Sequence, residues 1–417
     1  MNVTSDTILR WHVPALIFLY VLLIPYGESS LAIMLVFSLC GFYMLMRRYI
    51  SISPDYRSWV AITLALSIPL AISLFTAFRF DKTLITLTTF LLHAIAGIYI
   101  IDQLRKHERP TNVIFGIAVI VGIWTVSALP YQVRGVETSI LQQWVGHITG
   151  NYGDFPNIGN VLAHLSPFYF EAIYRFSKKF NNRWPWLLAI PLILSILMAG
   201  GRAGWIILIL VMAMFAVRMV AIKHFSTLSV AMGLAIAIGA VMSSTFMLPQ
   251  VERRVIQSLT LVDGGFEALD RAGSGRWQIW QETATLLPDR VFYGHGTHGT
   301  ARLLEAKGQA HRDFGYEHLY WLEIAVSTGA LGLVLYMCCF FYLVYLLLRK
   351  IDWGGYAFAP ILAAVCILFP FNVHWEFYGS RSASLMWLLL ALAFAFFLRE
   401  TRNNKTNAFA SQSTSTQ

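Results

Sequence analysis

The stretch Met198–Met219, MAGGRAGWIILILVMAMFAVRM, decides the class of fold to which this chain belongs. After Arg202 it continues without a charged residue as far as Arg218. A helix that crosses the hydrocarbon core of a bilayer needs roughly 20 predominantly apolar residues. The stretch therefore predicts a transmembrane helix at about 203–222, entered through a glycine-rich break that carries one arginine.

The composition extends this prediction to the whole chain. Of the 417 residues, 57% are hydrophobic and 13% are charged, and the mean hydropathy is +0.60. A soluble globular protein has about 25% charged residues, so we expect an integral membrane protein. The four cysteines all lie in apolar runs, which indicates packing roles rather than a disulfide framework or a zinc site.

Apolar segments recur along the chain, and together they predict an all-α polytopic membrane protein with about twelve transmembrane helices. The predicted spans are 12–25, 31–46, 58–78, 84–101, 112–130, 157–174, 186–199, 203–222, 226–248, 318–348, 356–372 and 382–398. The first span lacks a signal-peptide cleavage site, so we expect it to be retained.

These spans divide the chain into four parts. Residues 1–248 hold helices 1–9, with an external loop at about 131–156, and residues 249–317 form a large external loop. Residues 318–398 hold helices 10–12. The Ser-, Thr-, Asn- and Gln-rich tail at 399–417 is predicted to be cytoplasmic and disordered.

The distribution of basic residues predicts the orientation. With the N-terminus in the cytoplasm, 18 of the 31 Lys and Arg residues lie in cytoplasmic segments, and most of the others lie in the long loop 249–317. Short cytoplasmic loops are enriched in Lys and Arg, whereas long loops do not follow this rule. We therefore expect both termini to be cytoplasmic.

Arg202 is the first candidate functional residue. A guanidinium in a membrane segment is costly and usually marks a substrate or ion pathway. The alternative is an interfacial arginine whose side chain reaches the lipid headgroups. The glycines around it, Gly200, Gly201 and Gly204, favour the functional interpretation because they let backbone or ligand approach closely.

Arg276 and His318 are the next candidates. Arg276 follows Ser274 and Gly275 in the long loop, where it could bind substrate or be one more solvated charge. His318 ends the loop and opens an apolar run of about 30 residues, which predicts a helix roughly 45 Å long. A neutral imidazole there could act as a general base, although a hydrogen-bonding role in the loop is an equal alternative.

Other residues carry weaker signals. Arg79 and Lys82 lie on the same predicted external side as Arg202 and could bind phosphate or anchor the membrane interface. Glu28 is a rival candidate base. The histidines His295, His298 and His311 suggest a glycine-rich turn rather than a metal site, because we find no carboxylate or cysteine that completes a set of ligands.

The chain lacks Asp-x-Asp, and its external acidic residues are scattered along the sequence. Arginine binds phosphate oxygens through two parallel hydrogen bonds and stays charged, so it can replace a metal ion in neutralising a diphosphate. We therefore expect no metal ion and no other cofactor.

In these residues the chain resembles the O-antigen ligase and polymerase superfamily of lipopolysaccharide biosynthesis. The resemblance spans roughly residues 60–400 and rests on four motifs in order. They are Asp154–Asn160 with its Pro-Asn pair, Met198–Gly204 with Arg202, Ser274–Trp280 with Arg276, and His318 followed by Gly329 and Gly332. The chain departs from the family at Leu319, where a polar residue is usual.

The resemblance implies a metal-independent, inverting glycosyltransferase of the GT-C kind. It would transfer a polysaccharide from undecaprenyl diphosphate to lipid A–core at the periplasmic face of a Gram-negative inner membrane, without a nucleic-acid partner. Arg202 and Arg276 would hold the diphosphate, and His318 would activate the acceptor hydroxyl or orient the diphosphate.

Three alternatives remain. An O-antigen polymerase uses the same donor, and its Arg-x10-Gly pattern is matched by Arg254 and Gly265, which makes Arg254 a further candidate for substrate binding. A single dominant external loop favours the ligase. A transporter or flippase would explain an intramembrane arginine, but we find no internal repeat. A non-catalytic scaffold would not require Arg202 in a glycine break.

Overall fold

The computed structural model describes residues 5–26, 28–49, 56–107, 109–134, 155–199, 201–226, 276–308, 317–373 and 375–414. Within these ranges the regular secondary structure is helical. The longer helices of the first half are α1 (Ser5–Leu23), α2 (Ser29–Met46), α3 (Arg57–Ser73), α4 (Phe80–Lys106), α5 (Thr111–Arg134), α7 (Phe155–Phe180), α8 (Ala189–Met198) and α9 (Arg202–Ala221).

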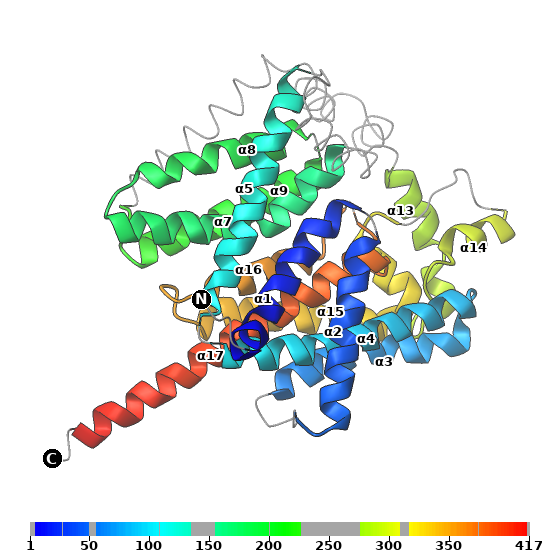
Figure 1. Ribbon diagram of the computed structural model, residues 1–417. Helices are drawn as coiled ribbons and strands as arrows, with labels where there is room; N and C mark the ends of the chain where they lie inside the picture. Colours follow the sequence, from blue (N-terminus) through cyan, green and yellow to red (C-terminus); the bar gives the residue numbers. More distant parts are fainter. Residues whose placement is uncertain are drawn as a thin grey trace.

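The second half begins with short helices and ends with long ones (Figure 1). These are α13 (Arg276–Ala284), the 3-10 turn η5 (Leu287–Arg290), α14 (Thr300–Ala306), α15 (Tyr320–Arg349), α16 (Phe358–Ile367) and α17 (Ser380–Thr414). In the described part of the chain, six helices are long and apolar enough to cross a membrane, and four shorter helices are also apolar.

The part of the chain that the structure describes is therefore that of an all-helical, multi-pass membrane protein. Eleven of the twelve expected spans coincide with described helices, whereas the expected span 226–248 lies outside the described residues. The number twelve stays a prediction.

Helix α7 lies at the centre of one half of the bundle, where it packs against α5, α8, α9 and α16. Almost all of its side chains from Ile158 to Tyr174 are buried, although several are polar. In the other half, α4 packs against α2, α3 and α17. The indole rings of Trp59 on α3 and Trp387 on α17 meet edge to face at 5.4 Å and join these helices.

Helix α15 differs from the single 30-residue helix that the apolar run predicts. At Gly329 the backbone turns to φ +70°, so the helix is broken near its first third. The carbonyls of Val326 and Ser327 accept hydrogen bonds from the backbone N–H groups of His295 and Gly296. A loop after η5 is thus held against the break and satisfies backbone groups that a continuous helix would have paired internally.

Two other expectations also need correction. The helix begins at Tyr320 with Leu319 as its N-cap, so His318 lies before the helix rather than opening it. At the other end of the chain, α17 continues as a helix to Thr414 where the composition predicts a disordered tail (Figure 1). The stretch from Arg399 to Thr414 has neither Gly nor Pro, which would end a helix begun by the apolar span.

Candidate active site

The three candidate residues lie at or just before the starts of three helices. Arg202 is the first residue of α9 and Arg276 is the first residue of α13, whereas His318 stands two residues before α15. Each side chain is partly buried. Helix N-termini attract anions because their first N–H groups point outward and the helix dipole is positive there.

Helix α13 is attached directly to the segment that carries His318. The indole Nε1 of Trp280 donates a hydrogen bond of 2.9 Å to the carbonyl of Glu317. Arg276 lies four residues before Trp280, and residues at this spacing share one side of a helix. Arg276 and His318 are therefore positioned by the same contact.

An apolar cluster strengthens this attachment. It contains Ile279 of α13 together with Leu319 and Leu322, and Leu319 is 4% exposed. A polar side chain at 319 would lose this burial. The departure of Leu319 from the family pattern thus has a structural explanation, since the residue helps to hold α13 beside His318.

A second chain of contacts joins the start of α9 to the start of α15. A Cβ added at Gly204 would lie 3.1 Å from the carbonyl oxygen of Gly159 on α7, so the two helices touch through their backbones. One residue further along α7, the carbonyl of Asn160 accepts a hydrogen bond from His164 Nδ1 at 2.8 Å.

His164 then continues this chain of contacts to the loop before α17. Its ring stacks on Trp375 with centroids 4.9 Å apart, and its Nε2 accepts a hydrogen bond from the side-chain amide of Asn372. The carbonyl of Asn372 accepts the backbone N–H of Tyr320. These contacts connect the first turn of α9, through α7 and the loop before α17, to Tyr320 at the start of α15.

His318 has a left-handed backbone conformation with φ +54°. Such a conformation is uncommon in non-glycine residues, although His adopts it more readily than β-branched residues. It costs of order 1–3 kcal/mol and persists only where the surroundings enforce it. The buried neighbours Glu317 and Leu319 supply that constraint on either side.

Three carboxylates gather near this segment, which the sequence did not indicate, because their positions are scattered along the chain. Glu323 accepts backbone N–H groups of Phe377 and Tyr378 at 2.7 and 3.0 Å, and it interacts electrostatically with Glu317 and Glu376. Burial, aided by the charge of Glu376, raises the pKa of Glu317 above its ordinary value.

His298 is the basic partner in this group. Its Nδ1 lies 2.6 Å from Oε1 of Glu376. His295, in the same glycine-rich turn, donates from Nε2 to the carbonyl of Leu286 at 3.0 Å. Its imidazole is buried, and this burial lowers its pKa. Within the described ranges no three His, Cys, Asp or Glu side chains are arranged as metal ligands.

A cavity of about 320 Å³ lies beside the 372–379 loop. It combines the charged side chains of Glu376 and Arg381 with serine hydroxyls, a phenol and an indole. Its lining consists of Tyr20, Ile24, Ser30, Val161, Trp375, Glu376, Gly379, Ser380, Arg381, Ser382 and Leu385. Paired donors and acceptors next to an aromatic ring are suited to a sugar, which presents hydroxyl groups and an apolar ring face.

Asn160 lies on α7 close to the start of α9, and it is the sequence neighbour of a residue in the cavity wall. It precedes Val161 of the cavity wall, and its own backbone contacts Gly204. Its side chain is 1% exposed, yet neither amide atom has a hydrogen-bond partner within the described part of the chain. A buried amide left in this way costs about 1–3 kcal/mol, which makes Asn160 a further candidate for contact with a substrate.

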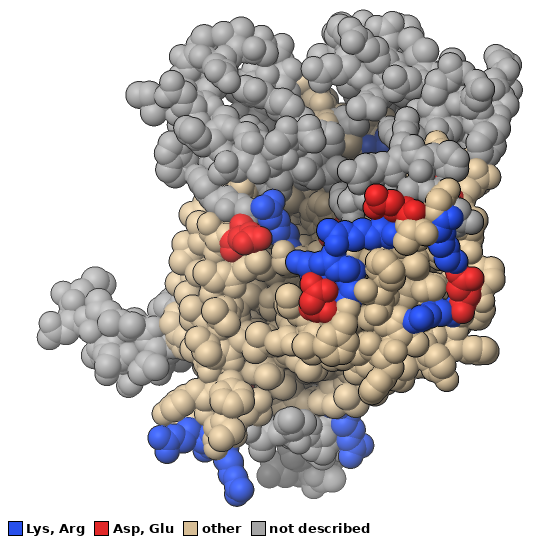
Figure 2. All heavy atoms as spheres, turned by 90° about the vertical axis from the view of Figure 1, so that its right-hand side faces the viewer, with Lys and Arg blue, Asp and Glu red and all other residues tan. Residues whose placement is uncertain are grey.

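Figure 2 shows a face of the molecule on which Lys and Arg side chains gather among Asp and Glu. The Arg79 guanidinium binds Asp81 at 3.1 Å, and Lys82 is exposed. The turn that carries them is held to the glycine-rich loop, because Phe78 N–H donates to the carbonyl of His295. The candidate Arg254 lies outside the described residues.

The described residues define a multi-pass membrane protein with arginines at two helix starts and a polar cavity that contains Glu376 and Arg381. Comparison with protein families makes this more specific, because residues 187–337 match the family model described as O-antigen ligase. No curated protein matched the chain. The segment 187–337 is thus similar to the O-antigen ligase family, which supports the superfamily that the motifs predicted.

The matched segment contains Arg202, Arg276 and His318. It ends at residue 337, so Glu376 and Arg381 lie outside it. Asn160 also lies outside it, before its first residue. The motifs could not bring these outlying residues together, because only the fold places Glu376 and Arg381 in one cavity with Val161, the neighbour of Asn160 on α7.

Proposed function

We propose that this protein is an O-antigen ligase, a metal-independent inverting glycosyltransferase of the GT-C kind. It transfers a polysaccharide from undecaprenyl diphosphate to lipid A–core at the periplasmic face of the Gram-negative inner membrane. The observation that supports this most is the chain of contacts that links the start of α9, through α7 and the loop before α17, to the segment before α15, to which α13 is attached.

In the proposed reaction, an acceptor hydroxyl attacks the anomeric carbon of the donor from the side opposite the diphosphate. The bond between that carbon and the diphosphate oxygen breaks, and the configuration inverts. Arg202 and Arg276 neutralise the charge that develops on the leaving diphosphate. His318 accepts the proton of the acceptor hydroxyl, and Arg79, Lys82 and Arg254 assist in binding the donor.

The cavity beside the loop that precedes α17 gives room for sugar units, and it is lined by Val161 on the first turns of α7, the helix that contacts the start of α9. Its indole and hydroxyl groups can orient a pyranose ring, while the helix starts hold the diphosphate. This division of roles supports the transfer of a polysaccharide to an acceptor sugar at one face of the membrane.

The proposal is tested by reconstituting the purified chain with lipid-linked polysaccharide and lipid A–core in the presence of EDTA. We expect polysaccharide on lipid A–core, and we expect the Arg202→Lys, Arg276→Lys and His318→Ala variants to lose most transfer, since Lys cannot form the paired hydrogen bonds of Arg. Activity that disappears in chelator would overturn the metal-independent mechanism. Near-normal transfer by all three variants would overturn the assignment of these residues.

The alternative function is an O-antigen polymerase, because the matched family covers both activities. The same reconstitution separates the two when a second lipid-linked unit replaces lipid A–core. Longer lipid-linked chains, without product on lipid A–core, would identify the polymerase.

A further inference from the structure

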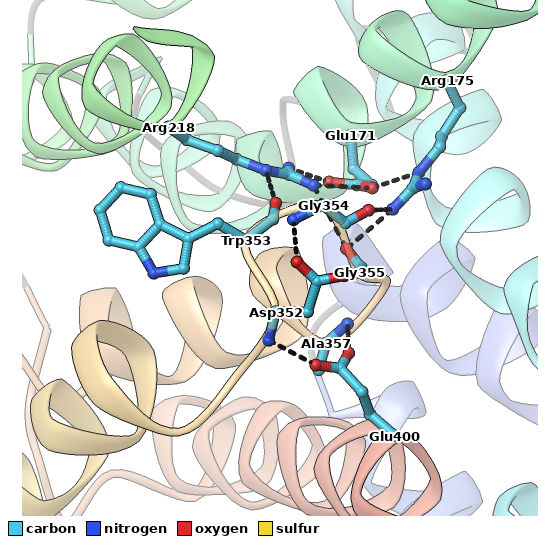
Figure 3. A network of polar contacts seen from close by, with 9 residues as sticks. All are labelled: Glu171, Arg175, Arg218, Asp352, Trp353, Gly354, Gly355, Ala357 and Glu400. Carbon is cyan, nitrogen blue, oxygen red and sulfur yellow. Dashed lines mark hydrogen bonds and ion pairs between the residues drawn. The ribbon is translucent and has the colours of Figure 1, made fainter. Parts of the chain in front are cut away.

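The end of the bundle opposite the candidate active site contains a buried network of charges (Figure 3). Arg218 lies 16 residues after Arg202 on α9, which corresponds to roughly 24 Å along the helix. Arg218 and Glu171 of α7 are both completely buried and form an ion pair. The Arg218 guanidinium also donates to the carbonyls of Trp353 and Gly355.

Arg175 connects this network to the surface. Its guanidinium donates to Glu171 at 2.6 Å and to the carbonyls of Gly354 and Gly355 at 2.8 and 2.7 Å. It also stacks on Tyr356, whose ring centroid lies 3.8 Å away. These contacts hold the side chains of Arg175 and Tyr356 in place, and the two side chains together form a fixed surface.

A cavity of about 500 Å³ lies against this surface. Its lining is Phe115, Arg175, Phe176, Lys178, Lys179 and Tyr356, which includes three basic side chains and three aromatic ones but no acidic one. Within the described residues, Lys178 and Lys179 form no salt bridge. The nearest carboxylate of the network, Glu171, is already bound by two arginines.

The cavity also has the features of a membrane border. Phe176 and Phe180 of the last turns of α7 are exposed, and their rings stack 6.3 Å apart. Tyrosine and tryptophan side chains are typical of the level of the lipid headgroups, and Tyr356 stands in the lining of this cavity. Basic pockets between helices at the cytoplasmic surface bind the headgroups of anionic lipids.

We propose that this cavity binds the phosphate group of an anionic phospholipid of the cytoplasmic leaflet. Lys178, Lys179 and the outer edge of Arg175 hold the phosphate, and the aromatic rings contact the glycerol and the first part of the acyl chains. The bound lipid would cover the surface where α5 and α7 meet the loop between α15 and α16.

The experiment uses the full chain in nanodiscs of phosphatidylcholine with increasing phosphatidylglycerol, and native mass spectrometry counts retained phosphatidylglycerol. The test variant is Lys178→Gln with Lys179→Gln. The matched control is Arg47→Gln with Arg48→Gln, which removes the same charge from exposed positions on the same predicted side. A basic residue near an anionic surface contributes about 1 kcal/mol, or about fivefold in affinity, so the test variant should bind roughly thirtyfold more weakly.

The control variant should retain the lipid nearly as well as the original protein. Equal losses in the two double variants would show a general attraction to the leaflet, and would overturn the proposed site, as would full retention by the test variant. Inorganic phosphate added to discs of phosphatidylcholine alone provides the last comparison. Equal thermal stabilisation by phosphate and by phosphatidylglycerol would show that the cavity binds a free anion, and would overturn the proposal of a lipid ligand.

Discussion

At the scale of single residues, some candidate residues could be selected from the sequence, whereas the role of others is visible only in the structure. Arg202, Arg276 and His318 could be selected from the sequence because glycines or a change from polar to apolar residues surround them. The role of Leu319 could not be inferred from the sequence, because it depends on apolar contacts with α13 that form only in the fold. Asn160 likewise stands out only once its amide is seen to be buried without a partner among the described residues.

Replacing Asn160 by Leu should separate ligand binding from stability. We expect transfer to fall by at least about tenfold if the amide contacts the substrate, whereas the melting temperature should stay the same or rise, because an unsatisfied buried amide is replaced by an apolar side chain. Reconstituted transfer and thermal unfolding in detergent measure the two effects. A large fall in stability with normal transfer per folded molecule would show that Asn160 is purely structural.

The buried carboxyl of Glu317 should make stability depend on pH. Burial raises the pKa of Glu317 in the folded protein above its ordinary value of 4.5, so the folded state holds the proton more tightly than the unfolded state. The resulting stabilisation is complete below the ordinary pKa and is lost as pH rises through the raised value. The melting temperature of the original protein should therefore fall with rising pH relative to that of Glu317→Gln. A difference between the two that stays constant with pH would contradict this.

At the scale of elements, α15 shows how a glycine pattern becomes a structure. The apolar run predicts a helix correctly, but the break at Gly329 exists because the loop after η5 packs into it. A Cβ at Gly329 would lie 2.3 Å from the backbone carbon of Phe292, and one at Gly332 would overlap Thr328. Gly329 is therefore required by the close approach of another backbone segment, and Gly332 by the Thr328 side chain, which only the folded arrangement reveals.

Gly329→Ala should prevent this packing. The substitution adds about 1–2 kcal/mol for the left-handed conformation and a severe overlap with Phe292, so we expect little folded protein in the membrane fraction. Gly308→Ala is the matched control, because Gly308 has φ +67° but a Cβ there would meet no described atom within 4 Å. Size-exclusion profiles and melting temperatures compare them, and equal effects would show that strain alone matters at Gly329.

At the scale of the whole molecule, helices α7 and α9 bring polar groups together at both ends of their contact. One end holds Asn160 and the start of α9, and the other holds the Glu171–Arg218 pair (Figure 3). The buried pair joins these two helices to the loop between α15 and α16, so it fixes the frame on which the opposite end is built. A buried pair is costly to break because the remaining charge is left without compensation.

Glu171→Gln should therefore destabilise the protein strongly. Removing one partner of a buried pair typically costs about 3–5 kcal/mol, and here Arg218 would keep its charge at 0% exposure. Replacing both partners with Leu and Met should recover part of the loss. Asp81→Asn, which breaks an exposed pair with Arg79, is the control and should change the melting temperature little. Similar effects of Glu171→Gln and Asp81→Asn would refute the structural role of the pair.

The sequence by itself determined the membrane class, the positions of eleven apolar helices, and the three motif residues, because hydrophobic length and local glycine and charge patterns are properties of contiguous residues. Tertiary structure alone decided the break in α15, the grouping of Glu317, Glu323 and Glu376, and the buried Glu171–Arg218 pair. These features join residues far apart in the chain, and their free energies depend on distance and burial, which only packing creates.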